Sequence, residues 1–121
     1  MLKVSKVSAN RVDLELAGSL DADAMRTGLD DLIAKSDGVE NGVMLYTITD
    51  FSMPTASAIG VEFQRLPKLL RMISKFDRCA VLSDQGWLRS AAEIEGALIP
   101  GLKFKAVELD QRTQAEHWLD E

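Results

Sequence analysis

The sequence is poor in the residues that build disulfides and metal sites. Its 121 residues include one cysteine, Cys79, and one histidine, His117. A lone cysteine excludes an internal disulfide, and one cysteine with one histidine is too few for a zinc site. Cys79 lies in the apolar run 79–82, which indicates a buried and unreactive thiol. His117 is expected on the surface of a terminal helix.

Long apolar runs and an excess of positive charge are also absent. The longest purely apolar runs are a few residues, far short of the ~20 that a membrane span needs. Lysine and arginine number 14 and aspartate and glutamate 19, for a net charge of −5, which argues against general affinity for nucleic acid. No long apolar stretch follows the charges of the first six residues, so we expect no signal peptide and a cytoplasmic location.

Familiar catalytic and cofactor-binding motifs are missing. The sequence has no dinucleotide-binding G-x-G-x-x-G, no Walker glycine–lysine loop and no G-x-S-x-G nucleophile elbow. Asp21 and Asp23 begin like a calcium loop, but Met25, Arg26 and Leu32 stand where further oxygen ligands and a glycine are required. We therefore predict no catalytic residue, no metal site and no cofactor, and we expect a protein that is not an enzyme.

The composition that remains, 46% apolar and 27% charged residues, is that of a soluble globular protein, and 121 residues suit one domain. Val12, Leu14 and Leu16 alternate with polar residues and predict a strand, which pairs as a hairpin with a shorter strand over 2–7. Apolar residues at helical spacing then predict a helix over Asp21–Ser36, which Asp21 caps.

The rest of the sequence alternates buried strands with helices. The run 43–49 predicts a central strand, and apolar residues at helical spacing over 59–73 predict a helix that Pro67 kinks or divides in two. The further predicted elements are a strand over 78–83, a helix with Trp87, Leu88, Ala91, Ile94 and Leu98 on one side, an edge strand over 102–107, and a short helix capped by Asp110. This order predicts one α/β domain over 1–121, with a mostly parallel five-stranded sheet, an N-terminal antiparallel hairpin and about four helices.

The segment 49–60, between a buried strand and a helix, is rich in hydroxyl groups and small residues. It follows the carboxyl end of a strand, where ligands usually bind, and the free amides of the next helix favour an anion. A phosphate on Ser57, Ser52 or Thr55 would add about −1.5 to −2 charges to the surface there. The alternative is that Ser52 or Thr55 simply caps the helix while the small residues permit close packing.

Positive charge is concentrated in one part of the sequence. Arg65, Lys68, Arg71 and Lys75 form a row beside the apolar row of the predicted helix, and Arg78 follows them. Such a row would dock an acidic protein, an anionic lipid surface or the acidic face of a partner subunit. The alternative is an ordinary solvated helix face.

The stretch Leu45–Val61 resembles the strand, loop and helix of the STAS domain, the fold of bacterial anti-sigma-factor antagonists. Its end, S-A-I-G-V over 57–61, is similar to the family's S-G-L-G-V, and the stretch is one residue longer than the family's. The resemblance implies that Ser57 falls on the serine that those proteins use as a phosphorylation switch, with Ser52 as a rival alignment. It also implies a protein partner, with a kinase-type regulator as one form of it.

The later part of the sequence resembles the SpoIIAA-like subgroup of that family. Residues 79–88, C-A-V-L-S-D-x-x-W-L, are similar to the subgroup's A-V-V-x-D-x-x-W-L, and residues 114–119, Q-A-x-x-W-L, to its closing E-A-x-x-W-L. The resemblance implies this fold, which is related to that of the apolar-ligand-binding proteins of the CRAL-TRIO type. Trp87 and Trp118 are expected to be core anchors rather than ligand contacts.

The main hypothesis is therefore a non-enzymatic STAS-like module that regulates or binds another protein, as a monomer or a homodimer. It would work through the loop and helix that follow the third strand. The expected interaction surface comprises Asp50, Phe51, Met53, Arg65, Lys68, Arg71 and Lys75.

The alternative hypothesis is a carrier or sensor of an apolar, lipid-like ligand. It rests on adaptable side chains in and around the same region, namely Met25, Met44, Met53, Met72, Phe51 and Phe63. These side chains have a simpler explanation, which is that they fill the core of a small domain.

Overall fold

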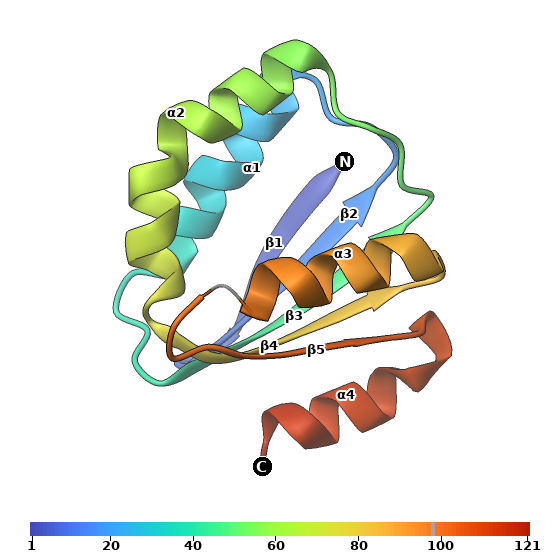
Figure 1. The fold of residues 1–121 in the computed structure, drawn as a ribbon. Helices are drawn as coiled ribbons and strands as arrows, with labels where there is room; N and C mark the ends of the chain where they lie inside the picture. The colour runs from blue at the N-terminus through green and yellow to red at the C-terminus, as the bar shows by residue number, and fades with distance from the viewer. Residues whose placement is uncertain (98) are drawn as a thin grey trace.

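The computed structural model describes residues 1–97 and 99–121 and contains, within them, one five-stranded sheet with helices on both faces (Figure 1). The strands are β1 Leu2–Ser8, β2 Arg11–Ala17, β3 Gly42–Thr49, β4 Phe76–Ser83 and β5 Lys103–Val107. The helices are α1 Ala22–Lys35, α2 Ala56–Ile73, α3 Gly86–Ala97 and α4 Arg112–Leu119, with a 3₁₀ turn, η1, over Leu109–Gln111.

The sheet has the strand order β1-β2-β3-β4-β5. β1 and β2 form an antiparallel hairpin in which Val4 lies opposite Leu14. Every later neighbour is parallel, so β3 sits at the centre between β2 and β4. The predicted α/β fold, with its mostly parallel sheet and N-terminal hairpin, is confirmed.

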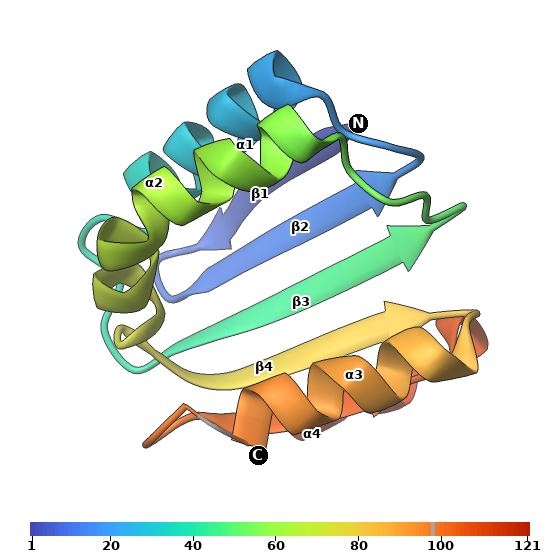
Figure 2. The same ribbon diagram turned by 45° about the horizontal axis from the view of Figure 1, so that its top comes forward.

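The two faces of the sheet carry different helices. Figure 2 shows α1, α2 and α3 in front of the strands and α4 behind them. Alternate residues of β2, Val12, Leu14 and Leu16, face the first layer and belong to the larger apolar core. Leu45 and Leu82 face the opposite way, into a smaller core beneath α4.

The ends of α1 follow from its sequence. Asp21 Oδ1 accepts a hydrogen bond from the Ala24 N–H at 2.8 Å, which confirms the predicted cap. Gly38, just beyond the helix, has φ of +81°, a left-handed conformation that glycine adopts without strain. A Cβ added to Gly28 would overlap the side chain of Leu2. Glycine at this position therefore lets α1 lie close against β1.

α2 is a single helix in spite of the proline near its middle. Pro67 lies inside the helical span Ala56–Ile73 and has no N–H to donate to the carbonyl of Phe63. Figure 1 shows α2 changing direction along its length, so the expected kink is present and the division into two helices is not.

Two expectations for α3 differ from the structure. Trp87 is 58% exposed and Ile94 is also exposed, so neither is a core residue. Leu88 and Ala92, on another side of the helix, pack against the larger core instead. Leu98 lies outside the described residues, and so does the side chain of Ala91.

The predicted cap of the last helix is also wrong. Asp110 lies inside η1 rather than at the start of α4, and the turn is closed by the Glu108 N–H, which donates to Gln111 Oε1 at 3.0 Å. The Ser83 hydroxyl accepts from the Gln85 N–H at 3.2 Å, one residue before α3 begins. Trp118 of α4 is half-buried and packs against the smaller core, as expected.

Candidate functional site

A large apolar cavity lies between the sheet and the helices α1, α2 and α3. Its volume is about 480 Å³, within the range of about 300–1,000 Å³ found for small-molecule pockets. All five strands and all three helices contribute to its wall. The lining includes Leu14, Leu16, Met25, Leu29, Met44, Ile48, Met72, Leu88 and Phe104.

The cavity exists because the helices on this face form two separate groups. α2 packs on α1, whereas α3 packs on β4 and β5. Figure 1 shows α2 and α3 standing apart over the sheet. The cavity lies between the side chains of α1 and α2 on one side and those of α3 on the other. The sheet surface below this gap is therefore covered less closely than the surface under either helix.

Several of the side chains predicted to contact an apolar ligand meet at this cavity. Met25, Met44, Met72 and Phe51 are all part of its wall. Met53 is 68% exposed on the loop outside. Phe63 likewise points to solvent from α2, so the structure separates these two from the rest.

Tyr46 is the largest polar side chain in the cavity wall. Burial raises the pKa of its hydroxyl above the ordinary value, and the nearby negative charge of Glu62 raises it further. Tyr46 is therefore protonated at neutral pH and has an O–H group to donate. Glu62 on α2 and Ser52 on the preceding loop are further polar side chains among the described lining residues.

Cys79 also lines the cavity but is not arranged for chemistry. Burial raises the pKa of its thiol to about 12, and a thiol, unlike a thiolate, is a poor nucleophile. The structure thus agrees with the interpretation of Cys79 as a buried and unreactive residue.

The loop between β3 and α2 is held in place by the loop that precedes α1. The Ser52 N–H donates to the Gly18 carbonyl at 3.3 Å, and the Thr55 N–H donates to the Leu20 carbonyl at 3.0 Å. The Ser19 hydroxyl donates to the Met53 carbonyl at 2.7 Å. These bonds join the carboxyl ends of β2 and β3, and they order the lip of the cavity.

An aromatic contact connects this loop to α3. The rings of Phe51 and Trp87 meet edge to face with their centroids 5.8 Å apart. Phe51 is part of the cavity wall, and Trp87 is more than half exposed. The pair therefore spans the lip of the cavity, between the loop that leads into α2 and the start of α3.

The three predicted phosphate-bearing residues occupy different positions near this loop. Thr55 Oγ1 accepts from the Ala58 N–H at 3.2 Å and caps α2, which confirms the simpler interpretation of that residue. Ser57 is exposed in the first turn of α2. Ser52 is exposed where the loop borders the cavity. Asp50, which begins the loop, is also exposed and has φ of +48°.

The predicted basic row divides between internal contacts and an exposed part. Arg65 Nε and Nη2 donate to the carboxylate of Asp30 on α1 at 2.7 and 3.2 Å, which raises the pKa of Arg65 and lowers that of Asp30. Lys75 Nζ lies 3.9 Å from a carboxylate oxygen of Asp37. Lys68 and Arg71 are exposed on α2.

The most exposed feature of α2 is its apolar row. Such a row ordinarily faces the core, but Phe63 is 70% exposed and Leu70 55%, with Leu66 exposed between them. The buried side of α2 is made by Ala58 and other residues, namely Val61, Leu69 and Met72. We call Phe63, Leu66 and Leu70 the apolar ridge.

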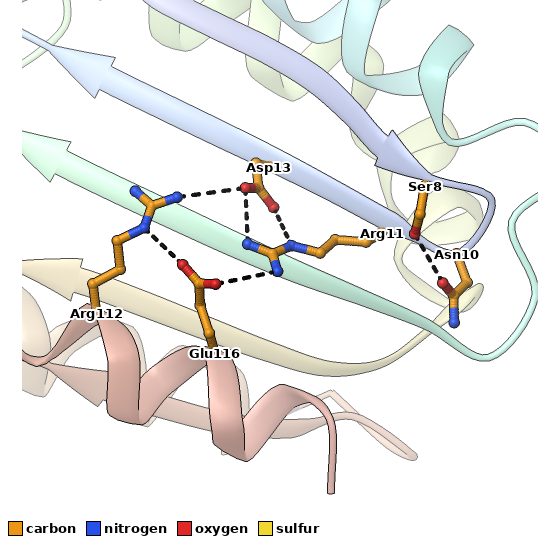
Figure 3. Close-up of polar contacts among 6 residues, drawn as sticks. All are labelled: Ser8, Asn10, Arg11, Asp13, Arg112 and Glu116. Carbon is orange, nitrogen blue, oxygen red and sulfur yellow. Dashed lines mark hydrogen bonds and ion pairs between the residues drawn. The ribbon is translucent and has the colours of Figure 1, made fainter.

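On the opposite face of the sheet, four charged side chains tie α4 to β2 (Figure 3). Arg11 donates to Asp13 at 2.8 and 3.0 Å and lies 3.6 Å from Glu116. Arg112 lies 2.8 Å from Glu116 and 3.8 Å from Asp13. The two arginines lower the pKa of Glu116, Arg112 most strongly. Each carboxylate thus faces two guanidinium groups, which identifies the cluster as a structural clasp.

The described residues contain no group of three histidine, cysteine, aspartate or glutamate side chains placed to hold a metal ion. His117 is exposed on α4, where it was predicted. Within the described part of the chain, every helix is too short or too polar to cross a bilayer.

The sequence interpretation missed the cavity and the exposure of the ridge. The signal for both was present in α2, which carries two apolar rows at helical spacing. One row contains Val61, Leu69 and Met72, and the other contains Phe63 and Leu70. A helix with two such rows has more apolar surface than it can bury by packing against the sheet and α1. This excess could have indicated that α2 has a second contact surface.

The arrangement of strands and helices is shared with proteins of known structure. A sequence model of the family described as SpoIIAA-like matches residues 11–120. An uncharacterised protein of the DUF3478 family from Shewanella loihica PV-4, with a SpoIIAA-like fold, matches with a TM-score of 0.74 at 18% identity, over 98% of this chain and 92% of that chain. The anti-sigma factor antagonist SpoIIAA in its unphosphorylated form matches with a TM-score of 0.53 at 14% identity, over 98% of this chain and 97% of that chain. A search of curated proteins finds no match.

Proposed function

The chain belongs to the SpoIIAA-like family, and from this premise we propose that it is a non-enzymatic regulatory module that binds another protein through the outer face of α2. The observation that carries the proposal is the apolar ridge, three large side chains that point to solvent side by side. Exposed apolar groups that gather in this way mark interaction surfaces.

The chemistry beside the ridge indicates what the partner presents. Lys68 and Arg71 are also exposed on α2, while Arg65 is already bound to Asp30. A complementary surface has an apolar centre for Phe63 and acidic side chains at its rim. Because the charged contacts lie at the rim, they would govern the association rate and its salt dependence more than the final affinity.

Ser57 is the proposed point of regulation on this surface. It is exposed in the first turn of α2, where the helix dipole favours a phosphate. Lys68 is about 16 Å further along the helix axis, too far to neutralise that phosphate. Phosphorylation would therefore place negative charge at one end of the binding surface and oppose an acidic partner.

The proposal is tested with a photo-crosslinking amino acid at Phe63 in the protein expressed in its own host. We expect a cross-link to a different protein, and we expect the same probe at Val7, another exposed apolar residue, on β1, to give none. The captured protein is then purified and titrated, and Leu70→Ser should weaken its binding at least about tenfold, or 1.4 kcal/mol. Cross-links only between copies of this chain, or equal capture from both positions, would contradict the proposal.

The role of Ser57 is tested separately with the purified partner. Ser57→Asp should weaken binding while Ser57→Ala leaves it unchanged, and both variants should keep the thermal stability of the wild type. Ser52→Asp is the matched variant for the rival position. If it weakens binding and Ser57→Asp does not, the regulatory site has been assigned to the wrong serine.

A second candidate function, the carriage or sensing of an apolar ligand, is favoured by one specific observation. This is the cavity of about 480 Å³, with its almost entirely apolar wall. A native mass measurement of protein from its own host, compared with the denatured mass, would detect a bound ligand. Protein that is free of ligand and also fails to bind a panel of apolar probes would contradict this candidate.

A further inference from the structure

The Tyr46 hydroxyl is a hydrogen-bond donor that the fold leaves unused. Tyr46 lies on the central strand β3 and lines the cavity. Burial is the main cause of its raised pKa, so the hydroxyl is protonated and withdrawn from bulk water. Within the described part of the chain it makes no hydrogen bond. Buried polar groups nearly always have a partner, because an unpaired one is costly.

The neighbours of Tyr46 explain why the sheet supplies no partner. In the register of the sheet, Tyr46 lies between Leu14 on β2 and Val81 on β4. Along β3, Met44 and Ile48 lie two residues away on the same face of the sheet. All four neighbours are apolar and line the cavity. A partner for the hydroxyl therefore has to come from what the cavity holds.

The other polar side chains of the described lining differ from Tyr46. Glu62 is exposed on α2 and already has an interaction partner. Ser52 is exposed on the loop before α2. Cys79 is buried, but a thiol is a weak hydrogen-bonding group. Among the described lining residues, Tyr46 thus carries the strong hydrogen-bonding side chain that is not exposed.

One donor in an apolar wall suits a ligand with one neutral acceptor. A carbonyl oxygen accepts from a phenol O–H and brings no proton that needs a partner of its own, whereas a ligand hydroxyl does. An apolar wall also favours an uncharged ligand, because it replaces none of the hydration of an ion. We propose that the cavity binds an uncharged apolar molecule with one carbonyl group, to which the Tyr46 hydroxyl donates a hydrogen bond. This inference rests on the second candidate function, because it takes the cavity as a binding site.

The test uses two probes that differ in a single group. Butyrophenone and butylbenzene have the same carbon skeleton, with C=O in the first where the second has CH₂. Both are titrated by calorimetry into the wild type and into Tyr46→Phe, which removes only the hydroxyl. We expect Tyr46→Phe to weaken the binding of butyrophenone about fivefold, or about 1 kcal/mol, as the loss of one hydrogen bond requires. The affinity for butylbenzene should stay the same.

Thr47→Val is the matched control. Thr47 follows Tyr46 on β3, faces the opposite side of the sheet and is not among the described lining residues. This variant also removes one hydroxyl, and it should leave both affinities unchanged. Urea unfolding without ligand gives a second measurement. Tyr46→Phe should not lower the free energy of unfolding, because its hydroxyl has no partner in the protein to lose.

The outcomes separate the inference from the function on which it rests. If neither probe binds the wild type, both the ligand-carrying function and this inference are wrong. If butylbenzene binds but Tyr46→Phe does not selectively weaken butyrophenone, the protein carries apolar ligands and the role assigned to Tyr46 is wrong. An equal effect of Thr47→Val, or a clear loss of stability in Tyr46→Phe without ligand, would also overturn the inference.

Discussion

The two faces of the sheet are covered in different ways. On the α4 face, Leu45, Ala80, Leu82 and Ala115 are at most 1% exposed, and the Arg11–Asp13–Arg112–Glu116 clasp closes one side of the contact. On the other face, three helices leave a cavity of about 480 Å³ between them. The α4 face is therefore closely covered, while the opposite face leaves an apolar space over the sheet and uncovered apolar side chains on α2.

Side-chain shape explains part of this difference. The core under α4 combines two alanines with leucines, and small residues on a helix and a strand let their backbones approach closely. The cavity wall is rich in methionine, whose flexible side chain adapts to irregular spaces. The central strands therefore carry a closely packed core on the α4 face and a more adaptable cavity wall on the opposite face.

The largest expected contrast comes from shortening one leucine on each face. Leu82→Ala should cost about 2–5 kcal/mol of unfolding free energy, because Leu82 is fully surrounded beneath α4. Leu69→Ala, in the cavity wall, should cost less than about 2 kcal/mol, because part of its surroundings is already empty. Urea denaturation measures both, and equal losses would mean that the two faces are packed alike.

A second contrast enlarges one alanine on a helix of each face. Ala115→Leu should destabilise the protein by about 1–3 kcal/mol, because Ala115 has no exposed surface and a larger side chain would overlap the core beneath α4. Ala92→Leu on α3 points into the cavity and should be neutral or stabilise the protein by up to about 1 kcal/mol. The melting temperatures of the two variants, compared with that of the wild type, test this contrast. Destabilisation by both would argue that the cavity is closed in solution.

The smallest expected effect concerns the clasp. The folded state lowers the pKa of Glu116, so its stabilisation is complete above the unfolded value of about 4.5 and is lost as the pH falls through the folded value. Glu116→Gln should cost less than about 1 kcal/mol at pH 7, since the pair is partly exposed. The difference between variant and wild type should shrink in urea unfolding below pH 4. A difference that stays constant down to pH 3 would exclude this role for Glu116.

The sequence predicted those elements whose pattern is local. The alternation of Val12, Leu14 and Leu16 identified β2, and the run 43–49 identified the central strand. Asp21 also caps α1 as predicted, because a cap depends on a few neighbouring residues. The helix predicted over 59–73 begins at Ala56, so Ser57, which was predicted between the strand and this helix, lies in its first turn.

The predictions failed where several elements compete for one surface. Trp87 and Phe63 have the character of core residues and lie at helical spacing, yet both face outward. Nothing local distinguishes the apolar row of α2 that meets the core from the one that meets solvent. That choice depends on where α1 lies, and the ion pair between Arg65 and Asp30 accompanies it.

By itself, the sequence determined the type and order of the elements and hence the parallel sheet, because hydrophobic period and backbone propensity act within a few residues of the chain. Only the tertiary structure decided that α2 and α3 stand apart, that Tyr46 and Glu62 share a cavity, and that the ridge remains uncovered. The physical reason is that an amphipathic pattern says how much apolar surface an element has, whereas the packing of its neighbours decides how much of that surface is buried.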